Sequence, residues 1–336
     1  MKKVLAIVMA VVLIAAVFAA CSAQPEESAE APASSSGDQI VFANLNGTRS
    51  DVWNNCSLDA FQWCADQVGV KVIEYENEFN TETQTNNMDL AVNEGVDGIN
   101  LFTITPELDV DLSKVAEKAG IPVVIENSNP EEGCVCESVA AYDYEELGYQ
   151  CALYMADVWK GKKVFLCLGA LGMNLVEPWE EGFARGMEET GNCFEVVGKQ
   201  YTDWATEKSM NVTQDLIQSG VEFDALFAHN GQMYAGCMAA LEDANLLDKV
   251  ETMTEGGNPD ELQWIKEGKH EYALSIPPNL QGIACFKALW MKVNGDTPPA
   301  QFELPATRVS KDNLDTAPSW ENNEIALEML GGLGDY

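Results

Sequence analysis

Two kinds of apolar pattern alternate along the chain from Gln39 onward. Short apolar runs, such as Lys163 to Leu168, have the length and composition of buried strands. Between them lie longer stretches in which apolar residues recur every three or four positions, as Leu58 and Phe61 do within Ser50 to Val68. Because this spacing places side chains on one face of a helix, the pattern predicts a regular alternation of strands and helices.

The alternation falls into two successive runs, separated by a loop rich in Asn, Pro and Glu from Asn127 to Gly133. Strands joined by helices pair in parallel through right-handed crossovers. The predicted fold class is therefore α/β, with two doubly wound parallel-sheet lobes. Ligands of such sheets bind beyond the carboxyl ends of the strands, so two facing lobes would surround one cleft. No repeat of individual residues is visible between the two runs.

The N-terminus has the pattern of an export signal. Lys2 and Lys3 precede an uncharged apolar run from Val4 to Ala20. This arrangement predicts a signal peptide over residues 1–20. The run is close to the minimum length of a membrane-spanning helix, so its length alone would also fit an uncleaved anchor.

The residues after this run favour a lipid anchor. Phe18-Ala-Ala-Cys21 resembles the lipobox of bacterial lipoproteins, with Phe18 in place of the usual Leu or Val. The resemblance implies lipidation of Cys21, and two or more acyl chains there would hold the protein at the membrane. Residues 21–38 are rich in Ser, Ala, Pro and Glu, which predicts a flexible tether. We therefore expect an extracytoplasmic, membrane-anchored protein, with simple secretion as the alternative.

Length and charge narrow the class of partner. The chain has 336 residues, enough for two domains beyond the tether. Its 19 basic and 54 acidic residues give a net charge of -35, which repels nucleic acid and anionic lipid surfaces. We expect no nucleic-acid partner. We interpret the charge as a contribution to solubility, and the alternative interpretation is a preference for neutral or cationic ligands.

Cysteine and histidine usage argues against metal chemistry. The sequence has ten Cys but two His, and the Cys134-Val-Cys136 pair by itself is a weak metal signal. That pair is the strongest candidate for redox or disulfide chemistry. Other cysteines lie in apolar patterns typical of small buried thiols, namely Cys64, Cys151, Cys167, Cys237 and Cys285. We expect no metal ion and no cofactor, and the chain has no Walker or Gly-x-Ser-x-Gly motif.

Several motifs resemble the type I periplasmic binding proteins, in particular their ribose- and galactose-type sugar-binding branch. The resemblance extends from Gln39 to about Asp315. The segments that carry it are Gly120-Ile-Pro-Val-Val, Glu181-Gly-Phe-Ala-Arg-Gly-Met, Ala225-Leu-Phe-Ala-His-Asn-Gly-Gln-Met-Tyr-Ala-Gly, Lys266-Glu-Gly-Lys and Arg308-Val-Ser-Lys-Asp-Asn-Leu.

This resemblance implies two lobes joined by a three-strand hinge. The expected first lobe comprises residues 39–140 and 277–306, and the second comprises 141–276 and 307–336. Hinge crossings are expected near residues 140–142, 276–279 and 305–309. The implied function is that of a monomeric substrate-binding lipoprotein of an ABC importer, with a membrane permease as partner and no enzymatic activity. Relatives that act as DNA-binding repressors carry a helix-turn-helix where this chain has its signal and tether.

The resemblance also implies the residues of the cleft. Trp53 and Trp204 occupy positions where the family stacks aromatic rings on a sugar, and an indole face suits the apolar face of a pyranose. The polar ligand-binding candidates are Asp51, Asn127, Glu177, Asn230 and Glu255. Asp51 also suits the N-cap of the helix that follows it.

Departures from the family pattern leave the ligand open. Asn127 and Ser128 replace an Asp-Arg pair, Glu177 lies near the position of a second Arg, and Ile276 replaces a Gln. We expect a monosaccharide or sugar alcohol, because carboxylates bind hydroxyl groups through strong hydrogen bonds. The loss of cations also allows a cationic or aminated solute. Two further alternatives are a sensory protein that presents ligand to a membrane receptor, and a glycosidase that uses Glu177 and Glu255.

Overall fold

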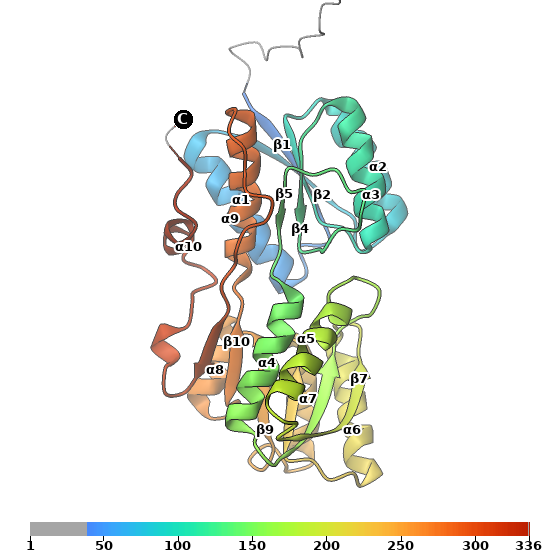
Figure 1. Cartoon of the computed structure of the whole chain (residues 1–336), viewed down its shortest axis with the longest axis vertical. Coiled ribbons are helices and arrows are strands. Elements are labelled where there is room, and N and C mark those ends of the chain that lie inside the picture. The colour runs from blue at the N-terminus through green and yellow to red at the C-terminus, as the bar shows by residue number, and fades with distance from the viewer. Residues whose placement is uncertain (1–38, 335) are drawn as a thin grey trace, which may run out of the picture. The chain divides into compact units, whose positions relative to one another are not determined.

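The strands of the protein form two separate sheets, as the computed structural model of residues 39–334 and 336 shows (Figure 1). The first sheet contains β1 (Val41–Asn46), β2 (Lys71–Glu76), β3 (Gly98–Leu101), β4 (Val123–Glu126) and β5 (Ser138–Ala140). The second contains β6 (Lys163–Leu168), β7 (Glu195–Tyr201), β8 (Ala225–Ala228), β9 (Glu251–Gly256), β10 (Tyr272–Ser275) and β11 (Thr307–Ser310). Their orders are β2-β1-β3-β4-β5 and β11-β10-β9-β8-β6-β7. Neighbouring strands pair in parallel, except for the antiparallel pair of β10 and β11.

Helices alternate with these strands and cover both sheets. Those of the first lobe are α1 (Val52–Val68), α2 (Thr81–Glu94), α3 (Pro106–Ala119), α9 (Pro278–Val293) and α10 (Asn323–Met329). Those of the second lobe are α4 (Tyr144–Val158), α5 (Val176–Glu189), α6 (Thr206–Ser219), α7 (Gly231–Asp243), α8 (Pro259–Glu267) and the 3-10 turn η1 (Leu314–Thr316). Each sheet has its own apolar core. The predicted fold class, two doubly wound parallel-sheet lobes, is confirmed.

The N-cap of α2 differs from the capping pattern that its sequence resembles. Thr81 and Gln84 have the spacing of a capping box at the start of α2. Instead Asn80 is the N-cap, and its side chain accepts a hydrogen bond from Thr83 N at 2.8 Å. Gln84 is fully buried, and its amide donates to the carbonyl of Phe102 at the end of β3. The helix start is thereby fixed against the cleft edge of the first sheet.

The chain passes between the lobes beside the cleft. It crosses from β5 to α4 and returns from β10 to α9. The Tyr142 hydroxyl in the first crossing donates to the carbonyl of Pro277 in the second, at 3.0 Å. A third crossing precedes β11, where Gln301 forms a bridge with Val139 of β5. These segments lie side by side, so they restrict how the two lobes move.

A fourth crossing was not expected. We assigned residues 307–336 to the second lobe, and β11 and η1 do lie there. The chain then returns, because α10 packs against α9 and Ala326 belongs to the apolar core that α1 and α9 share. The returning segment contacts the first lobe at Trp320, whose carbonyl oxygen accepts a hydrogen bond from the Cys56 thiol at 3.1 Å. Apolar residues along α10 make this return favourable, since they cover the otherwise exposed side of α9.

The predicted signal peptide, the lipidation site Cys21 and the tether lie outside the described residues. Within residues 39–334 and 336, no helix has both the length and the apolar character that a membrane crossing requires.

Two glycines let α4 and α5 approach closely. A Cβ atom on Gly148 would lie 1.9 Å from the carbonyl oxygen of Trp179, and one on Gly182 would lie 1.7 Å from that of Glu145. Real Cβ atoms do not come this close, so the crossing requires glycine at both positions. The contact matters for the cleft, because Trp179 on α5 is fully buried and donates a hydrogen bond to a cleft carboxylate.

We predict that Gly148→Ala lowers the free energy of unfolding by about 2 kcal/mol, because overpacking forces the helices apart. In an exposed helix, a change from Gly to Ala would stabilise the protein by about 1 kcal/mol. The sign of the measured change therefore distinguishes a close helix crossing from an exposed helix surface. Urea unfolding followed by circular dichroism measures the effect. Gly198→Ala in β7 is the control, since its nearest contact would be 3.3 Å. Equal stability of Gly148→Ala and the wild type would contradict the close crossing.

Candidate ligand-binding site

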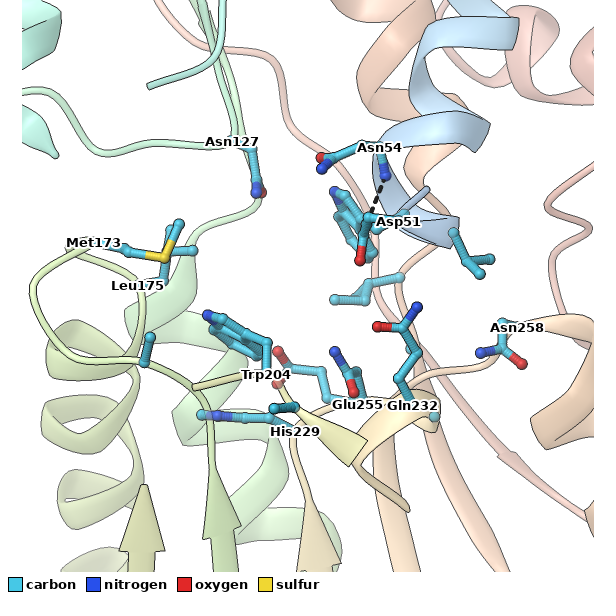
Figure 2. A pocket seen from close by; sticks show the side chains of 18 of the residues that line it. Asp51, Asn54, Asn127, Met173, Leu175, Trp204, His229, Gln232, Glu255 and Asn258 are labelled. Carbon is cyan, nitrogen blue, oxygen red and sulfur yellow. Dashed lines mark hydrogen bonds between the residues drawn. The ribbon is translucent and has the colours of Figure 1, made fainter. Parts of the chain in front are cut away.

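A cavity of about 590 Å³ lies between the carboxyl ends of the two sheets. Residues of both lobes line it (Figure 2). The lining includes these of the predicted residues: Asp51, Trp53, Asn127, Trp204, Asn230 and Glu255. Strand-end loops from two sheets thus meet at one site, as the fold class predicts.

Trp204 projects from the loop after β7 as a fixed aromatic surface. Its backbone and that of Asp203 are both left-handed, with φ of 60° and 51°. Such angles are costly for residues with a side chain, and they recur at ligand sites. The indole lies over Gly169, where a Cβ atom would come within 2.2 Å of the ring. It also stacks on His229, with ring centroids 5.5 Å apart.

His229 supports this surface as a neutral ring. Its Nδ1 accepts a hydrogen bond from Gly169 N at 3.0 Å, which leaves the proton on Nε2. Burial lowers the pKa of His229 to about 3. The imidazole is therefore uncharged at neutral pH, and it packs between Trp204 and the edge of Trp179.

Glu255 places a buried carboxyl group at the end of β9. Its Oε2 accepts from Trp179 Nε1 at 2.8 Å and from Cys151 Sγ at 3.5 Å. The other oxygen accepts no hydrogen bond from any residue that the structure describes, and the residue lines the cavity. Burial raises the pKa of Glu255 to about 7. This group can therefore accept or donate a hydrogen bond near neutral pH.

Three polar residues of the lining are also helix caps. Asp51 caps α1 by accepting from Asn54 N at 3.0 Å, which Figure 2 shows as a dashed line. Asn230 caps α7 and Asn258 caps α8, each with its side-chain oxygen. Since that oxygen is committed to the helix, the amide nitrogen of each Asn remains available to donate to a ligand.

Asn127 connects the lobes at the back of the cleft. It is 8% exposed and has a left-handed φ of 51°. Its side-chain oxygen accepts from the hydroxyl of Tyr144 on α4 at 2.7 Å. Nearby, Asn129 and Asn174 exchange hydrogen bonds between the lobes, the shorter from Asn174 Nδ2 to Asn129 O at 2.7 Å.

Trp53 lies at the hinge wall of the cavity. Its ring makes edge contacts with Tyr142, at 6.1 Å between centroids, and with Trp320, at 5.8 Å. These contacts give Trp53 a packing role that connects the hinge with the fourth crossing, and its role as a stacking surface for a ligand stays a prediction.

Glu177 does not belong to the cavity lining, in contrast to our prediction. It lies in the first turn of α5, where its Oε1 accepts from Gly172 N at 2.6 Å. Its carboxylate therefore connects the loop after β6 to the first turn of α5 through this hydrogen bond. The hypothetical acid–base pair of Glu177 and Glu255 is not brought together in the cavity.

The positions that depart from the family pattern divide in two. Ser128 turns into the first lobe, where its hydroxyl donates to Asp109 Oδ2 at 2.6 Å. Ile276, by contrast, does line the cavity and makes its wall more apolar.

Sequence reasoning missed several lining residues: Asn54, Phe79, Tyr144, His229, Gln232, Asn258, Glu261 and Trp320. The position of Asn258 directly before a helix-starting Pro259 was a usable signal, since Asn favours N-caps. Phe79 and Trp320 gave no comparable signal, because each lies outside the predicted helices and strands.

The lining is acidic. Among the described residues, it includes Asp51, Asp203, Glu255 and Glu261 and contains neither Lys nor Arg. Asp203 forms an ion pair with Lys208, which lies outside the lining. No group of three or more potential metal ligands occurs in the part of the chain that the structure describes.

The two facing lobes, the repeated crossings and the shared cavity define a two-lobed binding protein. The family model for the periplasmic binding protein domain matches residues 42–297, and the chain belongs to this family.

Individual relatives agree with this assignment. The ribose import binding protein of Bacillus subtilis is 26% identical over 286 residues, which cover 84% of this chain and 90% of the relative. A solute-binding protein of Actinobacillus succinogenes with bound D-allose has a TM-score of 0.77 at 22% identity, covering 83% of this chain and all of that one. The Caulobacter myo-inositol-binding protein has a TM-score of 0.77 at 20% identity, covering 84% and 96%. These two structures share the fold.

We predict that Glu255→Gln stabilises the ligand-free protein at pH 8. Burial raises the pKa of Glu255 in the folded state from 4.5 to about 7. As the pH rises between these values, Glu255 ionises more readily in the unfolded state than in the folded state, so the free energy of unfolding falls. Gln lacks this penalty, so the gain is on the order of 1 to 3 kcal/mol at pH 8 and disappears near pH 4.

Urea unfolding at a series of pH values tests this prediction. Glu117→Gln, exposed on α3, is the control and should leave the stability unchanged. A Glu255→Gln protein whose stability difference from wild type does not change with pH would contradict the burial argument.

Proposed function

We propose that the protein is the solute-binding lipoprotein of an ABC importer, and that it captures a monosaccharide or sugar alcohol by closure of its two lobes. The observation that carries the proposal is the cavity, which takes aromatic, amide and carboxyl groups from the strand ends of both lobes. Its volume of about 590 Å³ is within the range of small-molecule sites.

The arrangement suits a hydroxylated ligand. The indole of Trp204 offers a flat apolar surface to the C–H face of a sugar. Around it, Asn127, Asn230 and Glu255 offer donors and acceptors for hydroxyl groups, and carboxylates make the stronger of these hydrogen bonds. Because the groups are divided between the lobes, a ligand that contacts both favours the closed state over the open one.

Relatives support sugar as the ligand class. The Bacillus subtilis relative is named for ribose import, and the compared structures contain D-allose and myo-inositol. These names support transport as the role, with a membrane permease as partner. They also support a binding protein and not an enzyme. Lipidation of Cys21 would keep the protein at the outer face of the membrane, within reach of the permease.

A second candidate ligand is a cationic, aminated solute. It is favoured by the acidic lining, which contains no Lys or Arg among the described residues. An ammonium group near Glu255 would gain a charge-assisted hydrogen bond. It would also gain a cation–π contact with Trp204.

We predict that a neutral sugar or cyclitol raises the unfolding temperature of the protein. The panel consists of D-ribose, D-allose, myo-inositol, xylitol, D-glucose and D-glucosamine, measured by thermal shift at pH 7.5. A ligand present at 100 times its Kd adds about 2.7 kcal/mol of stability. A larger shift with D-glucosamine than with D-glucose selects the aminated class. If no compound of the panel raises the unfolding temperature, the proposed function is wrong.

We predict that Trp204→Ala weakens binding of the best panel compound by about tenfold to a hundredfold, because the stacking surface is lost. Isothermal titration calorimetry measures the affinity. Trp63→Ala is the matched control, since Trp63 packs against the first-lobe core and does not line the cavity. Equal losses of affinity in the two variants would contradict a ligand contact by Trp204.

A further inference from the structure

The loop after β2 in the first lobe has the same backbone conformation as the loop that carries Trp204. Both follow the second strand of their lobe and lead into a helix. Glu78 and Phe79 are consecutive left-handed residues with φ of 50° and 56°, while Asp203 and Trp204 have 51° and 60°. Two such residues in succession are rare outside glycine, so their occurrence at equivalent places is not a common loop geometry.

The hydrogen bonds of the two loops also correspond. Each loop is joined to the end of the first strand of its lobe and closed by a turn before its helix. The four bonds are Asn77 N to Asn46 O (3.0 Å), Thr202 N to Leu168 O (2.8 Å), Asn80 N to Asn77 O (2.9 Å) and Ala205 N to Thr202 O (2.9 Å). The lobes therefore share a structural repeat at the cleft that the sequence did not reveal.

Each loop places its aromatic ring over a glycine. Gly169 directly follows β6 and lies beneath the indole of Trp204. Gly47 directly follows β1, and a Cβ atom there would lie 2.8 Å from Cε1 of Phe79. In both lobes the absence of a side chain after the first strand makes room for an aromatic ring from the second loop.

Phe79 is exposed towards the cavity. It is 45% exposed and belongs to the cavity lining, together with Phe102 and Trp204. The exposed part of the phenyl ring stays in water and gains no burial free energy from the fold, and the left-handed backbone conformation costs free energy. Contact with a ligand would offset both costs.

We propose that Phe79 is the aromatic ligand contact of the first lobe, the counterpart of Trp204 in the second, and that the ligand is a cyclic sugar or cyclitol and not an open-chain polyol. This inference rests on the proposed function. Trp53 instead remains packed between Tyr142 and Trp320 at the hinge wall.

The ligand class follows from the two aromatic contacts. A pyranose, furanose or cyclitol ring presents C–H groups on its faces and hydroxyl groups around its edge. On closure of the lobes, such a ring would contact Phe79 and Trp204, and its hydroxyl groups would face Asn127, Asn230 and Glu255, which line the same cavity. An open-chain polyol has no comparable face, and it must lose the freedom of several rotatable bonds to bind.

The test compares Phe79→Ala with the control Leu90→Ala by isothermal titration calorimetry. Leu90 is 50% exposed on α2 and does not line the cavity, so both changes remove an exposed apolar side chain. The probes are D-ribose, D-allose and myo-inositol as rings, and xylitol and glycerol as open chains. We expect Phe79→Ala to weaken the best ring probe by about fivefold to tenfold, and Leu90→Ala to leave it unchanged.

A second variant tests the contact between Gly47 and the ring of Phe79. Gly47→Ala should displace the Phe79 ring, and since the nearest atoms are ends of side chains, the protein should still fold. Gly47→Ala should therefore weaken the ring probe in the wild type and have no further effect in the Phe79→Ala protein. Equal effects of Gly47→Ala in both backgrounds would overturn the contact.

The outcomes separate this inference from the proposed function. If no probe binds the wild type, the proposed function fails. If a ring probe binds and Phe79→Ala binds it as tightly, the proposed function stands and the role of Phe79 is wrong. Tighter binding of xylitol or glycerol than of every ring probe would overturn the cyclic ligand class.

Discussion

The hydrogen bond from the Tyr142 hydroxyl to the Pro277 carbonyl holds two of the chain crossings side by side, and the geometry of the cleft depends on it. Tyr142 is fully buried, so this donor has no water to replace the bond if it breaks. With the crossings fixed beside β5 and β10, the carboxyl ends of both sheets face one cavity. Tyr144, two residues further, extends the connection by donating to Asn127 at 2.7 Å.

Helix capping and ligand binding use the same residues in this fold. A short loop from strand to helix must end in a residue that satisfies the first free N–H groups of the helix, and Asn and Asp do this best. Because helices start at the cleft edge of each sheet, Asp51, Asn230 and Asn258 meet this local requirement and line the cavity as well. Their side chains are held in place before any ligand arrives, which lowers the entropy cost of binding.

The sequence predicted the order of the long elements because their apolar periods are strong, and β6 begins and ends where expected. It missed β5, β11 and α10, which are short and were not separable from loops by periodicity. The same limit applies to the site. Residues at strand ends could be predicted, whereas Phe79 and Trp320 depend on a left-handed loop and on the fourth crossing, which are set by tertiary packing. Glu177 was wrongly predicted to line the cavity. It follows β6 as expected, but its side chain turns back and accepts a hydrogen bond from Gly172 N.

The cavity carries less negative charge at neutral pH than its acidic residues indicate. An acidic lining is therefore compatible with a neutral sugar as the ligand. Burial raises the pKa of Glu255 and of Glu261 to about 7, so each is partly protonated at neutral pH. His229 is neutral for the same reason. A protonated carboxyl group donates one hydrogen bond and accepts others, which matches a hydroxyl group that does both. The cavity can therefore supply donors without Arg or Lys. An ammonium ligand would instead require Glu255 to ionise. The free energy needed to remove the proton from the buried carboxyl group would offset part of the attraction between the two charges.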